Sequence, residues 1–401
     1  MFSSGIKPGQ EKNESSAMKQ NRVNIAPRML RWARERSGKS DNYFAEHFPK
    51  FGEWERGVSF PTLKQVEMLA KVTYTPVGYL FLSAPPVESL PIPDFRTLGN
   101  RPMAQPSPNL LETVYACQQR QAWYQEFSRI TGEPPRSFVG SVSTADSVEF
   151  VADTMRNALG FDLEARRTCP SWTEALRRFI EQADELGVLV MCSGVVRNNT
   201  HRPLDPEEFR GFALSDPLAP LVFINGKDTK AAQMFTLAHE LAHIWIGQSA
   251  LSDAGAYAVP GHAVEAWCNR VAAELLAPLK VVREEFRGGE DLGTEVHRLA
   301  RRFKVSTLVV LRRIFDADGI TRAEFQEAYG GETALLRAAM TKGGGGDFYL
   351  TQAARVSKRF ARALVVSTLE GHTLYRDAFQ MLGVAKLETF NEMGRNVGVR
   401  V

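Results

Sequence analysis

The stretch FTLAHELAHIW (residues 235–245) contains the pattern H-E-x-x-H within a segment that is predicted to be helical. Two histidines four residues apart on a helix project from the same face, at a spacing that suits one zinc ion. Glu240 lies between them, where a general base can take a proton from a water molecule at the metal. The sequence therefore predicts a zinc site with His239 and His243 as ligands and Glu240 as the catalytic base.

The residues around this pattern favour a buried helix. Ala238, Leu241, Ala242 and Ile244 are apolar and compatible with a helix, and Gly247 is a plausible C-terminal stop. The alternative is a pair of core histidines held by hydrogen bonds alone. That alternative is disfavoured, because two imidazoles and a carboxylate buried without a metal would leave costly polar groups to satisfy.

A third ligand is required, because catalytic zinc normally has three protein ligands and an open fourth position. The extended pattern H-E-x-x-H-x-x-G-x-x-H fails, since position 246 is isoleucine and position 249 is serine. The next predicted helix, residues 264–278, offers Glu265, with Asn269 four positions later on the same face. Glu265 can complete the ligand set while Asn269 orients a ligating histidine. The competing ligands are Asp253, His262 and Glu274.

Short strands are predicted before the metal helix. The segments GVLVM (187–191), GFAL (211–214) and LVFI (221–224) are apolar, and the last is followed by an Asn-Gly turn. In zinc peptidases that combine a small sheet with an H-E-x-x-H helix, an edge strand beside the helix holds an extended substrate by main-chain hydrogen bonds. The sequence does not identify which strand is the edge.

The segments GFAL (211–214), VFIN (222–225), FTLAHELAH (235–243) and residues 265–278 together resemble the ImmA/IrrE family of metallo-endopeptidases. The resemblance implies an intracellular protease with a compact, thermolysin-like zincin core and one zinc ion per chain. It also implies that His239, His243 and Glu265 are the ligands and Glu240 the base. Family members cut a helix-turn-helix repressor and so release stress-response or mobile-element genes. The expected partners are such a repressor, as protein substrate, and a toxin nuclease.

Composition places the chain among ordinary globular proteins. Its 401 residues are enough for two or three domains, and 49 basic against 46 acidic residues give a net charge of +3. No apolar run approaches the roughly 20 residues needed to cross a bilayer, and residues 1–16 lack the apolar core of a secretion signal. The four cysteines are scattered and form no C-x-x-C pair. We therefore expect a cytoplasmic protein with reduced thiols and no membrane partner.

The N-terminal part has a signature of its own. A basic helix is predicted at 26–38, WERG occupies 54–57, and further helical segments follow at 61–70 and 77–82. This order resembles the Cro/repressor type of helix-turn-helix domain. Residues 18–57 hold nine Lys or Arg against five Asp or Glu, which favours contact with phosphates.

The same part departs from the helix-turn-helix pattern where DNA would be read. The segment 46–53 leaves room for a recognition helix of little more than one turn, whereas a reading helix must present several side chains to base edges. Weak DNA contact, docking of the protease's repressor substrate and a purely structural role all remain open. No DNA-binding residue is assigned.

The predicted fold class is α+β and mostly helical. The expected organisation is a disordered tail (1–17), a helix-turn-helix-like domain (18–84), a proline-rich extended linker (85–108), a zinc peptidase domain with a trailing helical segment (109–330) and a small helical C-terminal module (331–401). A run of glycines at 343–346 is expected to be a flexible joint.

Two functions from different classes fit these features. The first is a zinc endopeptidase that cleaves a helix-turn-helix repressor. The alternative is a non-proteolytic DNA- or protein-binding regulator, or an antitoxin-like partner, that uses the zincin fold as a scaffold. The size of the N-terminal and C-terminal additions supports the alternative, and the H-E-x-x-H pattern supports the enzyme.

Overall fold

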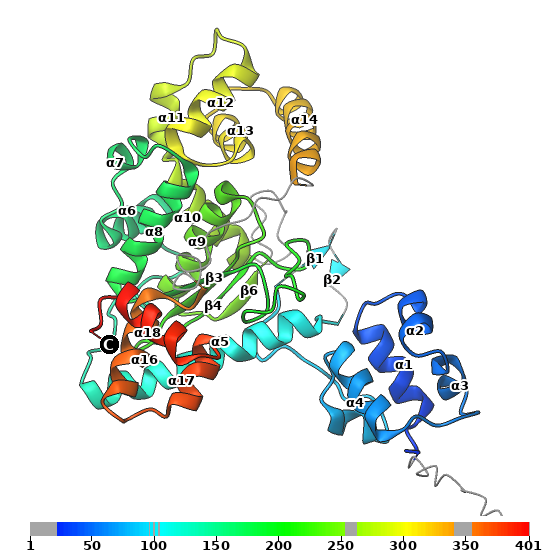
Figure 1. The fold of residues 1–401 in the computed structure, drawn as a ribbon. Coiled ribbons are helices and arrows are strands. Elements are labelled where there is room, and N and C mark those ends of the chain that lie inside the picture. Colours follow the sequence, from blue (N-terminus) through cyan, green and yellow to red (C-terminus); the bar gives the residue numbers. More distant parts are fainter. Residues whose placement is uncertain are drawn as a thin grey trace, which may run out of the picture. The chain divides into compact units, whose positions relative to one another are not determined.

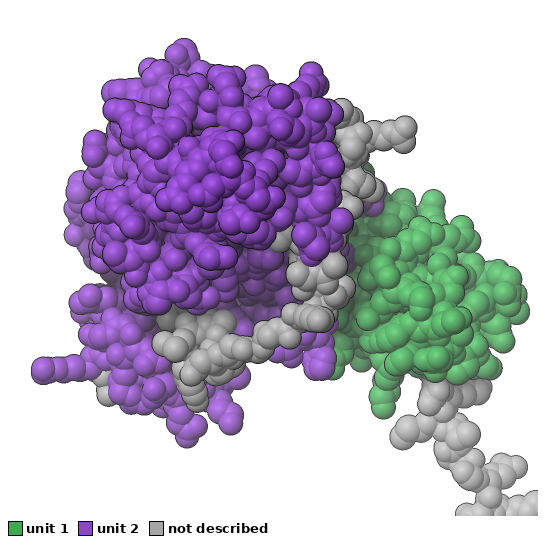
Figure 2. Space-filling model, turned by 90° about the horizontal axis from the view of Figure 1, so that it is seen from above, with its two compact units in different colours: residues 1–88 green, residues 89–401 purple. Residues whose placement is uncertain are grey.

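The computed structural model describes residues 22–95, 97–98, 101–102, 105–252, 263–340 and 355–400. The chain divides into two compact units, residues 1–88 and residues 89–401, which are coloured separately in Figure 2. The expected tail at 1–17 and the glycine run at 343–346 lie outside the described residues.

Unit 1 is a small helical domain built around aromatic side chains. Phe44, Phe51 and Trp54 are buried together, and Ser40 and Thr62 cap helices through their hydroxyl groups. The segment expected to hold the recognition helix forms a helix of only five residues, α3. The elements of unit 1 are α1 (Pro27–Arg36), α2 (Asp41–His47), α3 (Phe51–Glu55), α4 (Leu63–Val72) and a 3-10 helix, η1 (Val77–Phe81).

Unit 2 is organised around a four-stranded sheet (Figure 1). Its strands are β3 (Leu189–Ser193), β4 (Gly211–Leu214), β5 (Leu221–Asn225) and β6 (Ala250–Ser252), in the spatial order β3-β5-β4-β6. β3 runs parallel to β5, whereas β4 is antiparallel to both β5 and β6. β3 and β6 are therefore the two edges of this sheet.

Both faces of the sheet are buried, and alternate residues of each strand face opposite cores. Val190, Ala213 and Val222 belong to one cluster, which includes the helices on the side of the metal motif. Leu189 and Phe212 belong to the other cluster, which is completed by α5 and the C-terminal helices. This two-residue alternation decides which side chains of a strand can reach the metal motif.

Helices make up most of unit 2 (Figure 1). Those before the sheet and at its centre are α5 (Pro108–Thr131), α6 (Val148–Leu159), α7 (Leu163–Arg167), α8 (Trp172–Leu186), α9 (Lys230–Trp245) and α10 (Ala263–Leu276). Those that follow are α11 (Leu279–Glu285), α12 (Leu292–Phe303), α13 (Thr307–Asp316), α14 (Arg322–Met340), α16 (Lys358–Leu369), α17 (Tyr375–Leu382) and α18 (Leu387–Asn396). The predicted α+β, mostly helical class is confirmed. Within the described residues, no helix is both long enough and apolar enough to cross a membrane.

Parts of the proline-rich segment 85–108, for which the sequence predicts an extended linker, pair with other strands. It contains two paired strands, β1 (Thr97–Leu98) and β2 (Arg101–Pro102), and Asp94 forms a parallel bridge with Leu251 of β6. β6 is not among the strands that the sequence predicts. The bridge of Asp94 with Leu251 and the pairing of β6 with β4 join residues far apart in the sequence, which short local patterns do not reveal.

A buried ion pair fixes α10 to α13. The Arg313 guanidinium donates to Glu274 and to the carbonyl oxygen of Ala277, and Glu274 also accepts from the main-chain N–H of Leu279. Glu274 and Arg313 are both buried. Glu274 is therefore committed to joining two helices, which explains why it takes no part in the group formed by the two histidines.

We expect Glu274→Ala to lower the free energy of unfolding of unit 2 by about 3 kcal/mol, because it leaves a buried guanidinium without its counter-charge. Urea denaturation followed by circular dichroism measures this loss. The matched variant Glu284→Ala, at an exposed position of α11, should change the same free energy by about 0.5 kcal/mol or less. Equal stability of the two variants would contradict the structural role of the ion pair.

Candidate metal centre

Helix α9 carries the two histidines through the centre of unit 2. It begins after Thr229, whose hydroxyl accepts from the main-chain N–H of Ala232, and it is buried from Gln233 to Trp245. It ends at Ile246, and Gly247 follows with a positive φ of 74°. His239, Glu240 and His243 have no exposed surface.

Helix α10 packs against α9 and brings Glu265 to both imidazoles. Glu265 Oε2 lies 3.2 Å from His239 Nε2, and Glu265 Oε1 lies 2.9 Å from His243 Nε2. The two Nε2 atoms are 3.2 Å apart. Their ligand atoms all lie within 4.8 Å of one another. Within the described part of the chain, this is the one group of three or more His, Cys, Asp or Glu side chains close enough to hold a metal ion.

This arrangement fits a divalent metal ion. Ligand atoms of a tetrahedral zinc ion, each about 2.0–2.2 Å from the metal, lie roughly 3.4 Å apart, which is close to the separations seen here. Two ring nitrogens that face each other at 3.2 Å need either a proton or a cation between them. Two imidazoles and a carboxylate are also the donor set that suits zinc.

Asn269 supports one of the ligating rings. Its side-chain oxygen Oδ1 lies 2.9 Å from Nδ1 of His239, so that the Nδ1–H group donates to Asn269 and Nε2 is left to face Glu265. This contact fixes the orientation and tautomer of the ring. The structure thus brings together His239, His243, Glu265 and Asn269, all four of which the sequence analysis selected.

Glu240 lies against β4. Both of its carboxylate oxygens are buried and have no hydrogen-bond partner among the described residues. Gly211 makes this approach between strand and helix possible, because a Cβ atom there would lie 2.5 Å from Thr236 Cγ2 and 3.2 Å from Glu240 Oε1. A carboxylate that is buried, unpaired and next to the candidate metal ligands is placed as a general base would be.

The two carboxylates of the site have opposite electrostatic properties. Burial raises the pKa of Glu240 to about 8, although the charge of His239 opposes this shift. Burial acts on Glu265 in the same direction, but the charge of His239 and hydrogen bonds from both histidines hold the pKa of Glu265 well below its usual range. Glu265 is therefore anionic, as a ligand must be, whereas Glu240 has a higher affinity for a proton.

Ser252 of β6 is a site residue that sequence reasoning missed. Its hydroxyl oxygen lies 3.3 Å from His243 Nε2 and 3.5 Å from Glu265 Oε1. In the register of the sheet Ser252 is opposite Gly211, so both face α9. The only signal available in the sequence was a short apolar pair, Ala250 and Leu251, next to a small polar residue.

The competing ligands are placed elsewhere or not described. Glu274 pairs with Arg313, away from the histidines. Asp253 and His262 lie outside the described residues.

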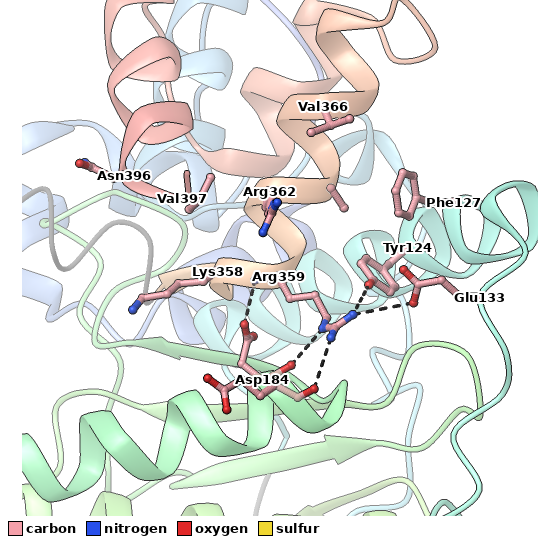
Figure 3. A pocket seen from close by; sticks show the side chains of 12 residues that line it. Tyr124, Phe127, Glu133, Asp184, Lys358, Arg359, Arg362, Val366, Asn396 and Val397 are labelled. Carbon is pink, nitrogen blue, oxygen red and sulfur yellow. Dashed lines mark hydrogen bonds and ion pairs between the residues drawn. The ribbon is translucent and has the colours of Figure 1, made fainter. Parts of the chain in front are cut away.

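A separate cavity of about 540 Å³ lies between α5, α8, α16 and α18 (Figure 3). Arg359 crosses one wall of this cavity and donates to the carbonyl oxygen of Asp184, while its main-chain N–H donates to the carboxylate of the same residue. A guanidinium N–H of Arg359 also donates to Tyr124 Oη at 3.4 Å. These contacts fasten the C-terminal helices to the end of α8, and none of the metal-centre residues lines the cavity.

Comparison with known proteins places the metal centre in a family. Residues 183–315 match the model of the IrrE N-terminal-like domain, a peptidase family, and this match supports the resemblance of this part of the chain to the ImmA/IrrE family. Residues 356–396 match a domain of unknown function (DUF8813). A search of curated proteins and a search of solved structures gave no match. The helix-turn-helix likeness of residues 18–84 stays a prediction.

We expect Glu265→Ala to remove stoichiometric zinc binding, because the site then loses its only anionic ligand among the three. Asn269→Ala should weaken zinc binding by about 10–100-fold, since it frees the His239 ring. Competition with a chromogenic chelator measures both affinities. Arg270→Ala, at the exposed neighbouring position, is the control and should bind zinc as the unaltered protein does. Unchanged zinc affinity in Glu265→Ala would exclude Glu265 as a ligand.

Proposed function

We propose that this protein is a zinc-dependent endopeptidase that hydrolyses peptide bonds at the centre formed by α9 and α10. The observation that supports this most directly is the position of Glu240. An unpaired, fully buried carboxylate is costly in a structural role, yet it lies beside a group of two imidazoles and a carboxylate that suits a metal. The match of residues 183–315 to a peptidase family supports the same function.

The side chains divide the work of the reaction among them. His239, His243 and Glu265 would hold zinc, which when bound supplies a Lewis acid that polarises the scissile carbonyl group and lowers the pKa of a water molecule. Glu240 accepts the proton of the attacking water and returns it to the leaving amine. Burial raises the pKa of Glu240 and so strengthens this carboxylate as a proton acceptor.

The proposed substrate is a helix-turn-helix repressor in the cytoplasm, whose cleavage would release stress or mobile-element genes. The support for this substrate is the family resemblance of the metal domain and the repressor-like order of helices in unit 1. A domain that resembles a repressor can dock a second repressor, and the five-residue α3 is a poor reader of base edges.

We expect Glu240→Gln to lower the rate of cleavage by about 10²–10⁴-fold while zinc remains bound, because only the proton acceptor is lost. The measurement is a gel of zinc-loaded protein incubated with a helix-turn-helix repressor encoded beside it, together with a zinc assay. One discrete cut by the unaltered protein and none by the variant is the expected result. Equal cleavage by both proteins would contradict the role of Glu240.

The second candidate function is a regulator that binds without cutting. The observation that favours it is the complete burial of His239, Glu240 and His243, which leaves no surface for a substrate to reach. In the same gel assay, stable co-purification with the repressor and no cleavage by the unaltered protein would support this candidate over the enzyme.

A further inference from the structure

The buried state of the metal centre requires an opening step if a substrate is to reach it. Two described elements contact the centre from the edge of the sheet. One is β6, through the hydroxyl group of Ser252. The other is the segment Pro93–Phe95, through the ring of Phe95, whose centroid lies 6.5 Å from that of the His243 ring, with an angle of 27° between the planes.

The segment Pro93–Phe95 is bound as an additional strand. The N–H of Phe95 donates to the carbonyl oxygen of Leu251 at 2.9 Å, and the N–H of Leu251 donates to the carbonyl oxygen of Pro93 at 2.9 Å. Asp94 and Leu251 thereby form a parallel bridge on the outer side of β6. This is the main-chain pairing by which extended peptides bind to the edge of a sheet.

The alternation of side chains places Phe95 on the catalytic side. Leu251 belongs to the core cluster on the far face of the sheet, and Ile92 is buried in the same cluster. Because neighbouring residues of a strand face opposite sides, Phe95 and Ser252 both face α9. An extended peptide in the place of residues 93–95 would therefore put its third side chain against the His243 ring.

The main-chain pairing of the segment is shorter than that of the strand on which it lies. β6 pairs with β4 over three residues, whereas the bridge between the segment and β6 joins Asp94 to Leu251. Short pairings of this kind open more readily than the body of a sheet. Opening of the segment would free the hydrogen-bonding groups of Leu251 and uncover the His243 ring, and β6 would stay in place.

We propose that the outer edge of β6 is the substrate-binding edge, and that Pro93–Phe95 covers it in the resting protein. The substrate is then an extended polypeptide segment with an aromatic side chain, which replaces Phe95 against His243. This inference rests on the proposed endopeptidase function. It adds to that function a binding surface, a class of substrate and an internal segment that competes with the substrate.

The first test measures access to the metal without measuring cleavage. We expect 4-(2-pyridylazo)resorcinol to capture zinc about tenfold faster from zinc-loaded, full-length Phe95→Ala than from the unaltered protein, because loss of the ring favours the open state. Phe95→Trp keeps an aromatic ring and should restore slow capture. Phe150→Ala removes an exposed ring on α6 and is the matched control. Equal capture rates for all four proteins would overturn the covering role of the segment.

The second test measures binding at the uncovered edge. A fluorescent peptide ESLPIPDFRTL (residues 88–98) should bind zinc-loaded Phe95→Ala, and the same peptide with alanine in place of its phenylalanine should bind about tenfold more weakly. Fluorescence anisotropy gives both affinities. Equal affinities would overturn the preference for an aromatic side chain. If these binding differences are found and the unaltered protein does not cleave the repressor in the gel assay, the binding edge stands and the proposed peptidase function fails.

Discussion

The contact between α9 and α10 concentrates four ionisable side chains in the buried interior of unit 2, and much of unit 2 supports this contact. Removing two imidazoles and two carboxylates from water costs several kcal/mol unless charges and hydrogen bonds compensate. Glu265 and Asn269 supply part of this compensation from α10. The ion pair of Glu274 with Arg313 holds the other end of α10 against α13, so the helix that provides the third ligand is fixed at both ends.

The sheet contributes to the site through its closeness to α9. Gly211 allows β4 to approach Glu240, and Ser252 reaches the histidines because it lies opposite Gly211 in the register. The opposite face of the same strands packs on α5 and the C-terminal helices, which Arg359 fastens to α8. The C-terminal module therefore stabilises the sheet from the side away from the metal centre, although it provides none of the residues that form the centre.

The sequence predicted the parts of the site that depend on spacing within a helix. His239 and His243 are one turn apart, as are Glu265 and Asn269, and both pairs occupy the positions that helical geometry requires. The sequence could not reveal β6, the role of Gly211 or the pairing of Asp94 with Leu251. Each of these depends on which strands meet across long stretches of chain, and a three-residue strand has too few residues to show a periodic pattern.

The burial of both faces of the sheet also constrains the register of β6. Four residues separate the end of α9 at Trp245 from the start of β6 at Ala250. A slip of β6 by one position would turn Leu251 toward the imidazoles and Ser252 toward the apolar core on the other face of the sheet. The register of β6 therefore decides whether a hydroxyl group or an apolar side chain faces the histidines.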